Sequence, residues 1–300
     1  MQDLNRPPAK LTVQLLHSLA LLATLLLVAN AAHAQTQPAP TPTPTSTPTL
    51  EHEFFKNILH DQGAIWTAPF HLHNRDARWL APLSLGAGAL LVTDQEAAEA
   101  IHDNRTRLNV SRDVSYLGAP YGAGSIAAVF YLYGRAHHDA RARETGLLAG
   151  EALIDSSIIV GALKLATERR RPRSRPDAGE FFTGGNSFPS GHAISAWSVA
   201  TVVAHEYHDR PLVQVAAYGL ASAVSVARYT GRNHFPSDIL VGSALGYGIG
   251  RYVYRTHHRQ TTDAGGGDTF AQERSKLWPL VAPHYDRQAR IYGATLAWNF

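Results

Sequence analysis

Two basic residues, Lys164 and Arg171, stand seven positions apart around the end of a predicted helix at residues 143–168. A separation of seven is about two helical turns, so the spacing predicts that both cations face the same side. Two fixed cations in that arrangement suit a dianionic phosphate. Four further arginines crowd the same stretch: Arg169, Arg170, Arg173 and Arg175. Taken alone, such a run is more typical of a solvated charged face than of a binding site.

The tetrapeptide from Pro189 to His192 opens a second predicted helix, at residues 190–208. Proline and Ser190 suit a helix start, and Gly191 lets the backbone approach a ligand closely. The free amides at a helix amino terminus attract an anion, and His192 would lie beside that anion with a titratable proton. A motif of four residues often arises by chance, so it suggests an anion site without establishing one.

A third cluster joins the end of a predicted helix at 211–228 to the start of another at 237–255, and it contains Arg228, His234 and Asp238. The spacing of four between His234 and Asp238 allows the carboxylate to hold one imidazole nitrogen, which would fix the tautomer and leave the other nitrogen free to attack. A lone histidine is more often structural than catalytic. A histidine with a carboxylate, an arginine and a second histidine elsewhere favours catalysis.

Together the three clusters resemble the three-part signature of the type 2 phosphatidic acid phosphatase and vanadium haloperoxidase superfamily. The matching positions are, in order, Lys164, Arg171, Pro172, Pro189, Ser190, Gly191, His192, Arg228, His234 and Asp238. One position departs: the family usually has Ser before the arginine of the third cluster, whereas this chain has Ala227. That change removes a hydroxyl that could support the site but none of its charged groups. The resemblance implies an all-α fold, a helical bundle of about six core helices.

The resemblance also implies a role for each matching position. Five groups would bind the phosphoryl oxygens: Lys164, Arg171, Arg228, the Ser190 hydroxyl and the Gly191 amide. His234 is implied as the nucleophile, Asp238 as the group that orients it, and His192 as the general acid for the leaving oxygen. Such a site needs no metal and no cofactor, because fixed cations and amides already stabilise the charge on the equatorial oxygens.

The expected function is a metal-independent phosphoric monoester hydrolase that acts through a phosphohistidine intermediate. Its substrate would be a lipid phosphate of the phosphatidic acid kind or a small phosphate ester. Two alternatives stay open: a vanadate-dependent haloperoxidase, since the same cradle would hold vanadate, and a catalytically silent envelope-binding protein. Two other histidine-rich stretches are expected to bind no metal: His205–His208 lacks the zinc-protease spacing, and His137–Asp139 lies in a predicted loop.

Glycine and proline breaks separate six predicted helices, near residues 79–93, 121–135, 143–168, 190–208, 211–228 and 237–255. A shorter amphipathic helix is predicted at residues 51–59. Polar residues such as Glu151, Asp155 and Gln214 interrupt the apolar runs, so few of them reach the length and purity of a membrane span. We therefore expect a soluble bundle with at most peripheral attachment to a membrane or the envelope.

The first 34 residues are typical of a secretory signal. Arg6 and Lys10 precede an uncharged, Leu-rich run that ends in the small-x-small sequence Ala32, His33, Ala34. A retained membrane anchor is the alternative, because the run is nearly long enough to span a bilayer. Either form places the rest of the chain outside the cytoplasm, in the periplasm or cell envelope.

Behind the signal the composition changes twice. Residues 35–50 are almost entirely Pro, Thr, Gln, Ser and Ala and are expected to be a tether. The helical domain is expected at residues 51–255 and a tail at 256–300. In that tail, residues 277–285 and 290–300 flank a polar turn and could form a small β-hairpin.

Composition limits the partners. The chain has no cysteine, which excludes disulfides, thiolate zinc sites and a lipoprotein anchor. Its formal charge of +3 becomes +2 without the first 34 residues, because Asp3, Arg6 and Lys10 carry a net +1. That excess is too small to indicate a nucleic-acid partner. The expected partner is the phosphate-ester or lipid-phosphate substrate.

Overall fold

The computed structural model describes residues 50–74, 76–102, 104–174, 178–258, 280–286 and 291–297. The expected signal and nearly all of the tether lie outside these residues, so their boundaries stay predictions. The chain divides into two units, Met1–His258 and Arg259–Phe300, and each is described by itself.

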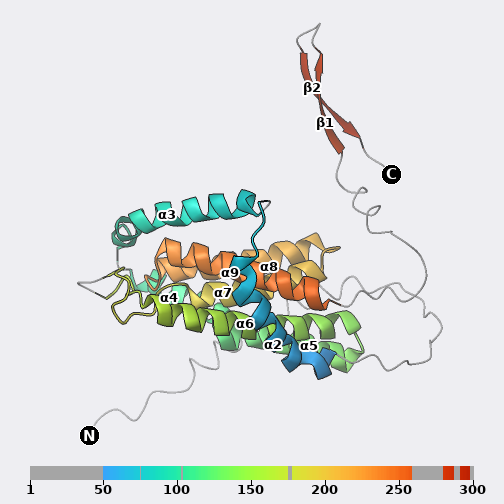
Figure 1. Cartoon of the computed structure of the whole chain (residues 1–300), viewed down its shortest axis with the longest axis horizontal. Coiled ribbons are helices and arrows are strands. Elements are labelled where there is room, and N and C mark those ends of the chain that lie inside the picture. The colour runs from blue at the N-terminus through green and yellow to red at the C-terminus, as the bar shows by residue number, and fades with distance from the viewer. Residues whose placement is uncertain are drawn as a thin grey trace, which may run out of the picture. The chain divides into compact units, whose positions relative to one another are not determined.

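The first unit is helical throughout its described part (Figure 1). Its α-helices are α2 (Leu50–Thr67), α3 (Ala77–Glu99), α4 (Arg105–Ser115), α5 (Pro120–His137), α6 (Ala140–Thr167), α7 (Gly191–Glu206), α8 (Pro211–Thr230) and α9 (Pro236–His257). Two short 3₁₀ helices, η1 (Ala68–Phe70) and η2 (Tyr116–Gly118), join them. The predicted all-α class is confirmed, and the six predicted core helices correspond to α3 and α5 to α9.

Two helices differ from the prediction. The amphipathic segment expected at 51–59 continues to Thr67 as α2, and α4 was not predicted. Helix α4 is polar along most of its length, so it lacks the long apolar runs by which the other helices are recognised in the sequence. The available sequence signal was its N-cap, because the Asn104 side chain accepts a hydrogen bond of 3.0 Å from the amide of Arg107.

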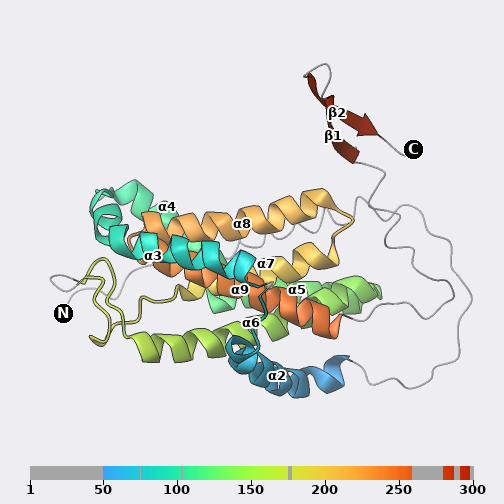
Figure 2. The same cartoon turned by 45° about the horizontal axis from the view of Figure 1, so that its top comes forward.

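Helix α7 lies at the centre of the bundle, with most of its residues buried and other helices on several sides (Figure 2). Its closest neighbour is α9, which presents Gly242, Gly246 and Gly250, four residues apart and thus on one face. A Cβ at Gly246 would lie 2.4 Å from the carbonyl oxygen of Ile194, and one at Gly250 would lie 2.4 Å from that of Ser198. Glycine therefore permits α9 to pack directly on the backbone of α7, which fixes the first turns of both helices relative to each other.

Helix α6 is, within the part of the chain that the structure describes, the helix long and apolar enough to cross a membrane. The core helix of a soluble protein meets the same criterion, and 56% of the apolar window of α6 is buried inside the bundle. The helix also carries Glu151 and Asp155, which are both fully buried.

The second unit contains the predicted hairpin. Strand β1 (Leu280–Asp286) pairs antiparallel with β2 (Ile291–Ala297), and Leu280 lies opposite Ala297. The outer ends of the predicted hairpin, residues 277–279 and 298–300, lie outside the described residues.

Candidate active site

The eight predicted site residues gather where α6 and α8 end and α7 and α9 begin (Figure 2). Lys164 lies in the last turn of α6, whereas Arg171 lies beyond the end of that helix at Thr167. The two cations converge as the spacing predicts, but Arg171 does so from the loop and not from a shared helix face. Their common partner is Asn186: the Lys164 ammonium donates to its backbone oxygen at 2.9 Å, and Arg171 Nε donates to its side-chain oxygen at 2.9 Å.

The loop between α6 and α7 folds back on itself to place these groups. The amide of Arg170 donates to the Glu180 oxygen at 2.9 Å, and the amide of Ser187 donates to the Arg169 oxygen at 2.8 Å. A Cβ at Gly185 would lie only 2.1 Å from that same Arg169 oxygen, so a side chain there is excluded. The backbone contact between the two arms of the loop thus depends on glycine.

The start of α7 has the features expected of the predicted anion site. Ser190 is the N-cap and its hydroxyl makes no capping bond. Because the first bond to the Ser190 oxygen comes from the Ile194 amide, at 3.0 Å, the amides of the first helical turn stay free for a ligand. The Ser190 hydroxyl is itself buried, with no hydrogen-bond partner among the described residues. Gly191 lies beside Lys164, since an added Cβ would stand 3.8 Å from the ammonium nitrogen.

Arg228 supplies a second unpaired donor in the last turn of α8. The residue is buried, and its Nε has no partner within the described part of the chain. Its backbone oxygen accepts from the amides of Asn233 and His234 at 3.1 and 3.3 Å, which ties the loop bearing His234 to this helix. Buried donors without partners are rare in native structures. Arg228 and Ser190 therefore indicate a site built for an anion.

His234 and Asp238 meet, although not through helical spacing. His234 precedes α9, whose N-cap is Phe235, and Asp238 is the third residue of that helix. The Asp238 carboxylate accepts from the Phe235 amide at 3.0 Å and lies 3.5 Å from His234 Nδ1. Its Oδ2 also accepts from the Ser187 hydroxyl at 2.5 Å. One carboxylate therefore caps the helix and holds the histidine ring.

Arg169 is a functional residue that the sequence prediction missed. It was assigned to the solvated charge run, but it is only 2% exposed. Its guanidinium donates to Asp238 Oδ1 at 2.6 Å and to Asp94 Oδ2, on α3, at 2.8 Å. The rings of Phe181 and Phe235 lie 4.7 and 4.4 Å from its central carbon. Arg169 therefore fixes the carboxylate that holds His234.

The neighbouring arginines also have partners. Arg170 Nε donates to the Thr183 oxygen at 3.0 Å, and the Arg173 guanidinium donates to the Gly231 oxygen at 2.7 Å. Arg175 lies outside the described residues.

The cations and burial set the protonation of the site. Burial, followed by the charge of Arg228, lowers the pKa of His192 to about 3. Burial also lowers the pKa of His234 to about 4, against the opposing effect of Asp238. Burial and the charge of Arg171 lower the pKa of Lys164 to about 8. Burial alone would raise the pKa of Asp238, but hydrogen bonding to His234 and the charge of Arg169 outweigh it and lower that pKa. Both histidines are therefore neutral at pH 7, beside an excess of positive charge.

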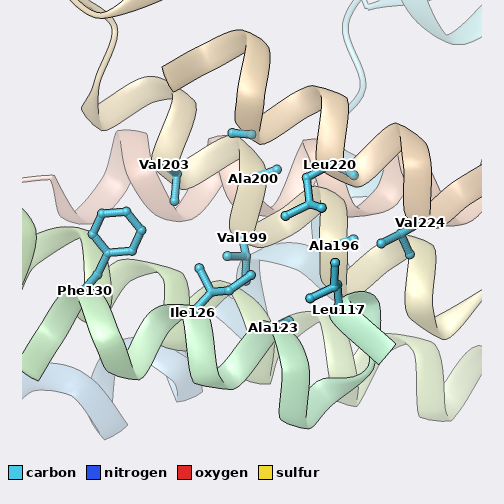
Figure 3. A pocket seen from close by; sticks show the side chains of 12 residues that line it. Leu117, Ala123, Ile126, Phe130, Ala196, Val199, Ala200, Val203, Leu220 and Val224 are labelled. Atoms are coloured by element: carbon cyan, nitrogen blue, oxygen red, sulfur yellow. The ribbon is translucent and has the colours of Figure 1, made fainter. Parts of the chain in front are cut away.

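An apolar cavity of about 40 Å³ lies behind the site, between α5, α7 and α8 (Figure 3). Gly118 separates it from the site, because a Cβ there would stand 2.3 Å from Val224 and 2.8 Å from the His192 oxygen. None of the residues that line this cavity is charged, so the cavity is not part of the anion site. Its lining is apolar: Leu117, Ala123, Ile126, Phe130, Ala196, Val199, Ala200, Val203, Ala217, Leu220, Ala221 and Val224.

Comparisons with known proteins give partial matches to this chain. The chain is 34% identical over 109 residues to the lipid A 1-phosphatase of Porphyromonas gingivalis, an alignment that covers 35% of this chain and 24% of that protein. It thus spans about a quarter of the curated relative. The crystal structure of a transmembrane PAP2 type phosphatidylglycerolphosphate phosphatase from Bacillus subtilis aligns with a TM-score of 0.45 and 22% identity, over 68% of this chain and 93% of that one.

The model of the PAP2 superfamily matches residues 145–262, a range that contains all three clusters. The predicted resemblance is therefore confirmed for this helical region, which matches the PAP2 superfamily.

Proposed function

We propose that this chain is a phosphatase that hydrolyses phosphoric monoesters through a phosphohistidine at His234, without a metal in the reaction. The observation that carries the proposal is the pair of buried, unpartnered donors, Ser190 Oγ and Arg228 Nε, beside two further cations. Lys164 and Arg171 provide those cations, and both donate to Asn186. A phosphoryl group would supply acceptors to all of them, and only an anion would balance their charge.

The first chemical step forms a bond between nitrogen and phosphorus. Asp238 lies against Nδ1 of His234, so Nε2 is the nitrogen left with a lone pair for attack. As that bond forms, the bond from phosphorus to the leaving oxygen breaks, and His192 gives its proton to that oxygen. In the second step water attacks phosphorus and gives a proton to His192. The phosphorus–nitrogen bond then breaks and phosphate leaves.

A lipid phosphate is the substrate class that we favour over a soluble ester. The curated relative is named for a lipid phosphate, lipid A 1-phosphate. In addition, η1 and α3 expose large apolar side chains, including Phe70 at 84%, Trp79 at 73% and Val92 at 84%. Helix α3 also carries Asp94, the partner of Arg169, so this apolar surface belongs to a helix that supports the site. An exported enzyme with such a surface would act on lipid headgroups in the envelope while attached peripherally.

A substrate panel tests this function. The purified chain should release phosphate from phosphatidic acid in mixed micelles and from an aryl phosphate, in the presence of a chelator, and vanadate should block both reactions because it mimics the five-coordinate transition state. Activity lost in brief exposure to chelator and restored by a divalent ion would refute the metal-free chemistry. Turnover of bromide and peroxide with vanadate, and of no ester, would identify a haloperoxidase instead.

A second prediction concerns pH. The general acid must be protonated, and the low pKa of His192, about 3, means that its charged fraction falls as pH rises in the free enzyme. A bound dianion offsets Lys164, Arg171 and Arg228 and should raise that pKa. The pH profile of kcat reports the enzyme–substrate complex, and that of kcat/KM reports the free enzyme. For an alkyl phosphate we therefore expect kcat to fall at a higher pH than kcat/KM does. An aryl phosphate serves as the control, because its leaving oxygen hardly needs a proton; a shift of the same size for both esters would contradict the role of His192.

A further inference from the structure

Away from the phosphate site, three carboxylates and an imidazole meet inside the bundle. Asp61 comes from α2, Glu151 and Asp155 from α6, and His257 from the last turn of α9. Helix α2 lies beside α6 in both views (Figures 1 and 2). The three acidic side chains are 0% exposed. No part of the proposed reaction uses these residues.

Their contacts leave two oxygens without a partner. His257 Nε2 lies 2.8 and 2.9 Å from the two oxygens of Asp61. Asn57 donates to Glu151 Oε1 at 3.1 Å. The second oxygen of Glu151 and Oδ2 of Asp155 are buried with no hydrogen-bond partner among the described residues. These are acceptors that a ligand would satisfy.

The charge of the cluster is also unbalanced. Even a protonated His257 would neutralise only one of three carboxylates, and a buried charge without a counter-charge is costly. A cation bound among these carboxylates would supply both the missing charge and a partner for the unpaired oxygens.

We propose that this cluster binds one divalent transition-metal cation, such as Zn²⁺ or Mn²⁺, that fastens α2 to α6 and α9. Ligand atoms from Asp61, Glu151 and His257 already lie within 4.8 Å of one another. Ligands about 2.1 Å from a tetrahedral cation stand roughly 3.4 Å apart, so small side-chain rotations would close the site. Asp155 lies outside that group, and its buried, unpaired Oδ2 would be the fourth donor. Carboxylate oxygens with one imidazole nitrogen favour these metals over Ca²⁺, which prefers oxygen alone.

A second cluster provides a contrast. Glu144, Glu206 and His258 also lie within metal-ligand reach of one another. There, however, the His258 ring lies 3.1 Å from each glutamate, and hydrogen bonds to Glu144 and Glu206 raise the pKa of His258 to about 9. The imidazolium itself is the counter-charge, and neither glutamate is left with an unpaired buried oxygen. This cluster differs from the first in having no unpaired buried carboxylate oxygen, and it serves as the control.

The proposed metal is structural. Asp155 precedes Lys164 by nine residues on α6, which is about 13 Å along a helix axis. The cation would therefore stabilise the bundle while the phosphate chemistry proceeds without it. Its presence is separable from activity by measuring metal content and thermal stability.

The test uses the full chain, stripped with chelator and then dialysed against Zn²⁺ or Mn²⁺. We expect one bound equivalent by elemental analysis and a rise in Tm of roughly 5–10 °C at free metal about a hundred times Kd. The double variant with the isosteric substitutions Glu151→Gln and Asp155→Asn should bind no metal equivalent and show no rise in Tm on addition of metal. The same pair should make the stripped protein more stable, because it removes two unbalanced buried charges.

The matched control is Glu206→Gln, which removes a carboxylate from the other cluster and should keep the bound equivalent. Circular dichroism confirms that each variant is folded before its metal content is compared. The proposal is overturned if the stripped chain takes up no equivalent, or if the double variant binds as much metal as Glu206→Gln does. Surface histidines would bind metal equally in both variants, so they cannot produce the expected difference.

Discussion

Replacing His234 with Ala is expected to lower kcat by about a thousandfold or more and to abolish covalent labelling, because the reaction loses its nucleophile. The substrate would still bind, since Lys164, Arg171 and Arg228 are untouched. Acid quench of a single turnover with labelled phosphate ester, followed by mapping of the acid-labile phosphate, measures the effect directly. His208→Ala is the matched control, because this exposed histidine lies beyond the end of α7 and should leave both quantities unchanged.

His192→Ala should behave differently from His234→Ala. Loss of the general acid slows esters with poor leaving groups far more than an aryl phosphate, and phosphoenzyme should still form from the aryl ester. The two histidines need opposite protonation states during attack, one neutral and one charged. The nucleophile would be assigned wrongly if the wild-type chain carried no label on His234, or if His234→Ala retained most of the activity.

The proposed mechanism requires His192 to gain a proton when the substrate binds. Burial and nearby cations hold both histidines neutral, with the pKa of His192 at about 3 and that of His234 at about 4. A neutral His234 is ready to attack, whereas His192 needs its proton. Because a dianion offsets the cations that lower the pKa of His192, binding of the substrate would itself favour the charged acid.

The three clusters could be predicted from the sequence because each is local. Ser190 and Gly191 are typical of a helix start, and the structure places them at the start of α7. Asp238 lies four residues from His234, so their contact follows from a single turn of chain. Such signals depend on neighbours in the sequence, and most of the helices follow from the same kind of pattern.

The residues that the prediction missed depend on distant partners. No local feature distinguishes Arg169 from Arg173. Arg169 is buried because it binds Asp94 and Asp238, which lie 75 and 69 residues away in the chain. Asn186 is equally inconspicuous in sequence, and its role appears only where the loop brings it to both Lys164 and Arg171. A contact between elements that are far apart leaves no periodicity to find.

Replacing Arg169 with Met should have the largest effect on stability, because it leaves Asp94 and Asp238 as buried carboxylates without their shared cation. Removal of one partner from a buried ion pair costs about 3–5 kcal/mol, and denaturant unfolding followed by circular dichroism would measure it. Arg173→Met is the control from the same stretch. The Arg173 side chain is exposed and donates one hydrogen bond to the Gly231 oxygen, so apart from the loss of that bond the substitution should change the free energy of unfolding by no more than about 0.5 kcal/mol.

Two further measurements separate lost charge balance from lost packing. In an Asp94→Asn background only Asp238 is left uncompensated, so Arg169→Met should cost less there than in the wild-type chain. The pKa of Asp238 is lowered in the folded wild type, so its contribution to stability is present at neutral pH and is lost as pH falls through that pKa. In Arg169→Met, protonation of Asp238 removes the unbalanced charge, and the difference in stability from wild type should narrow as pH falls. A difference that is independent of both Asp94 and pH would mean that Arg169 acts through its packing between Phe181 and Phe235 and not through the carboxylate that holds His234.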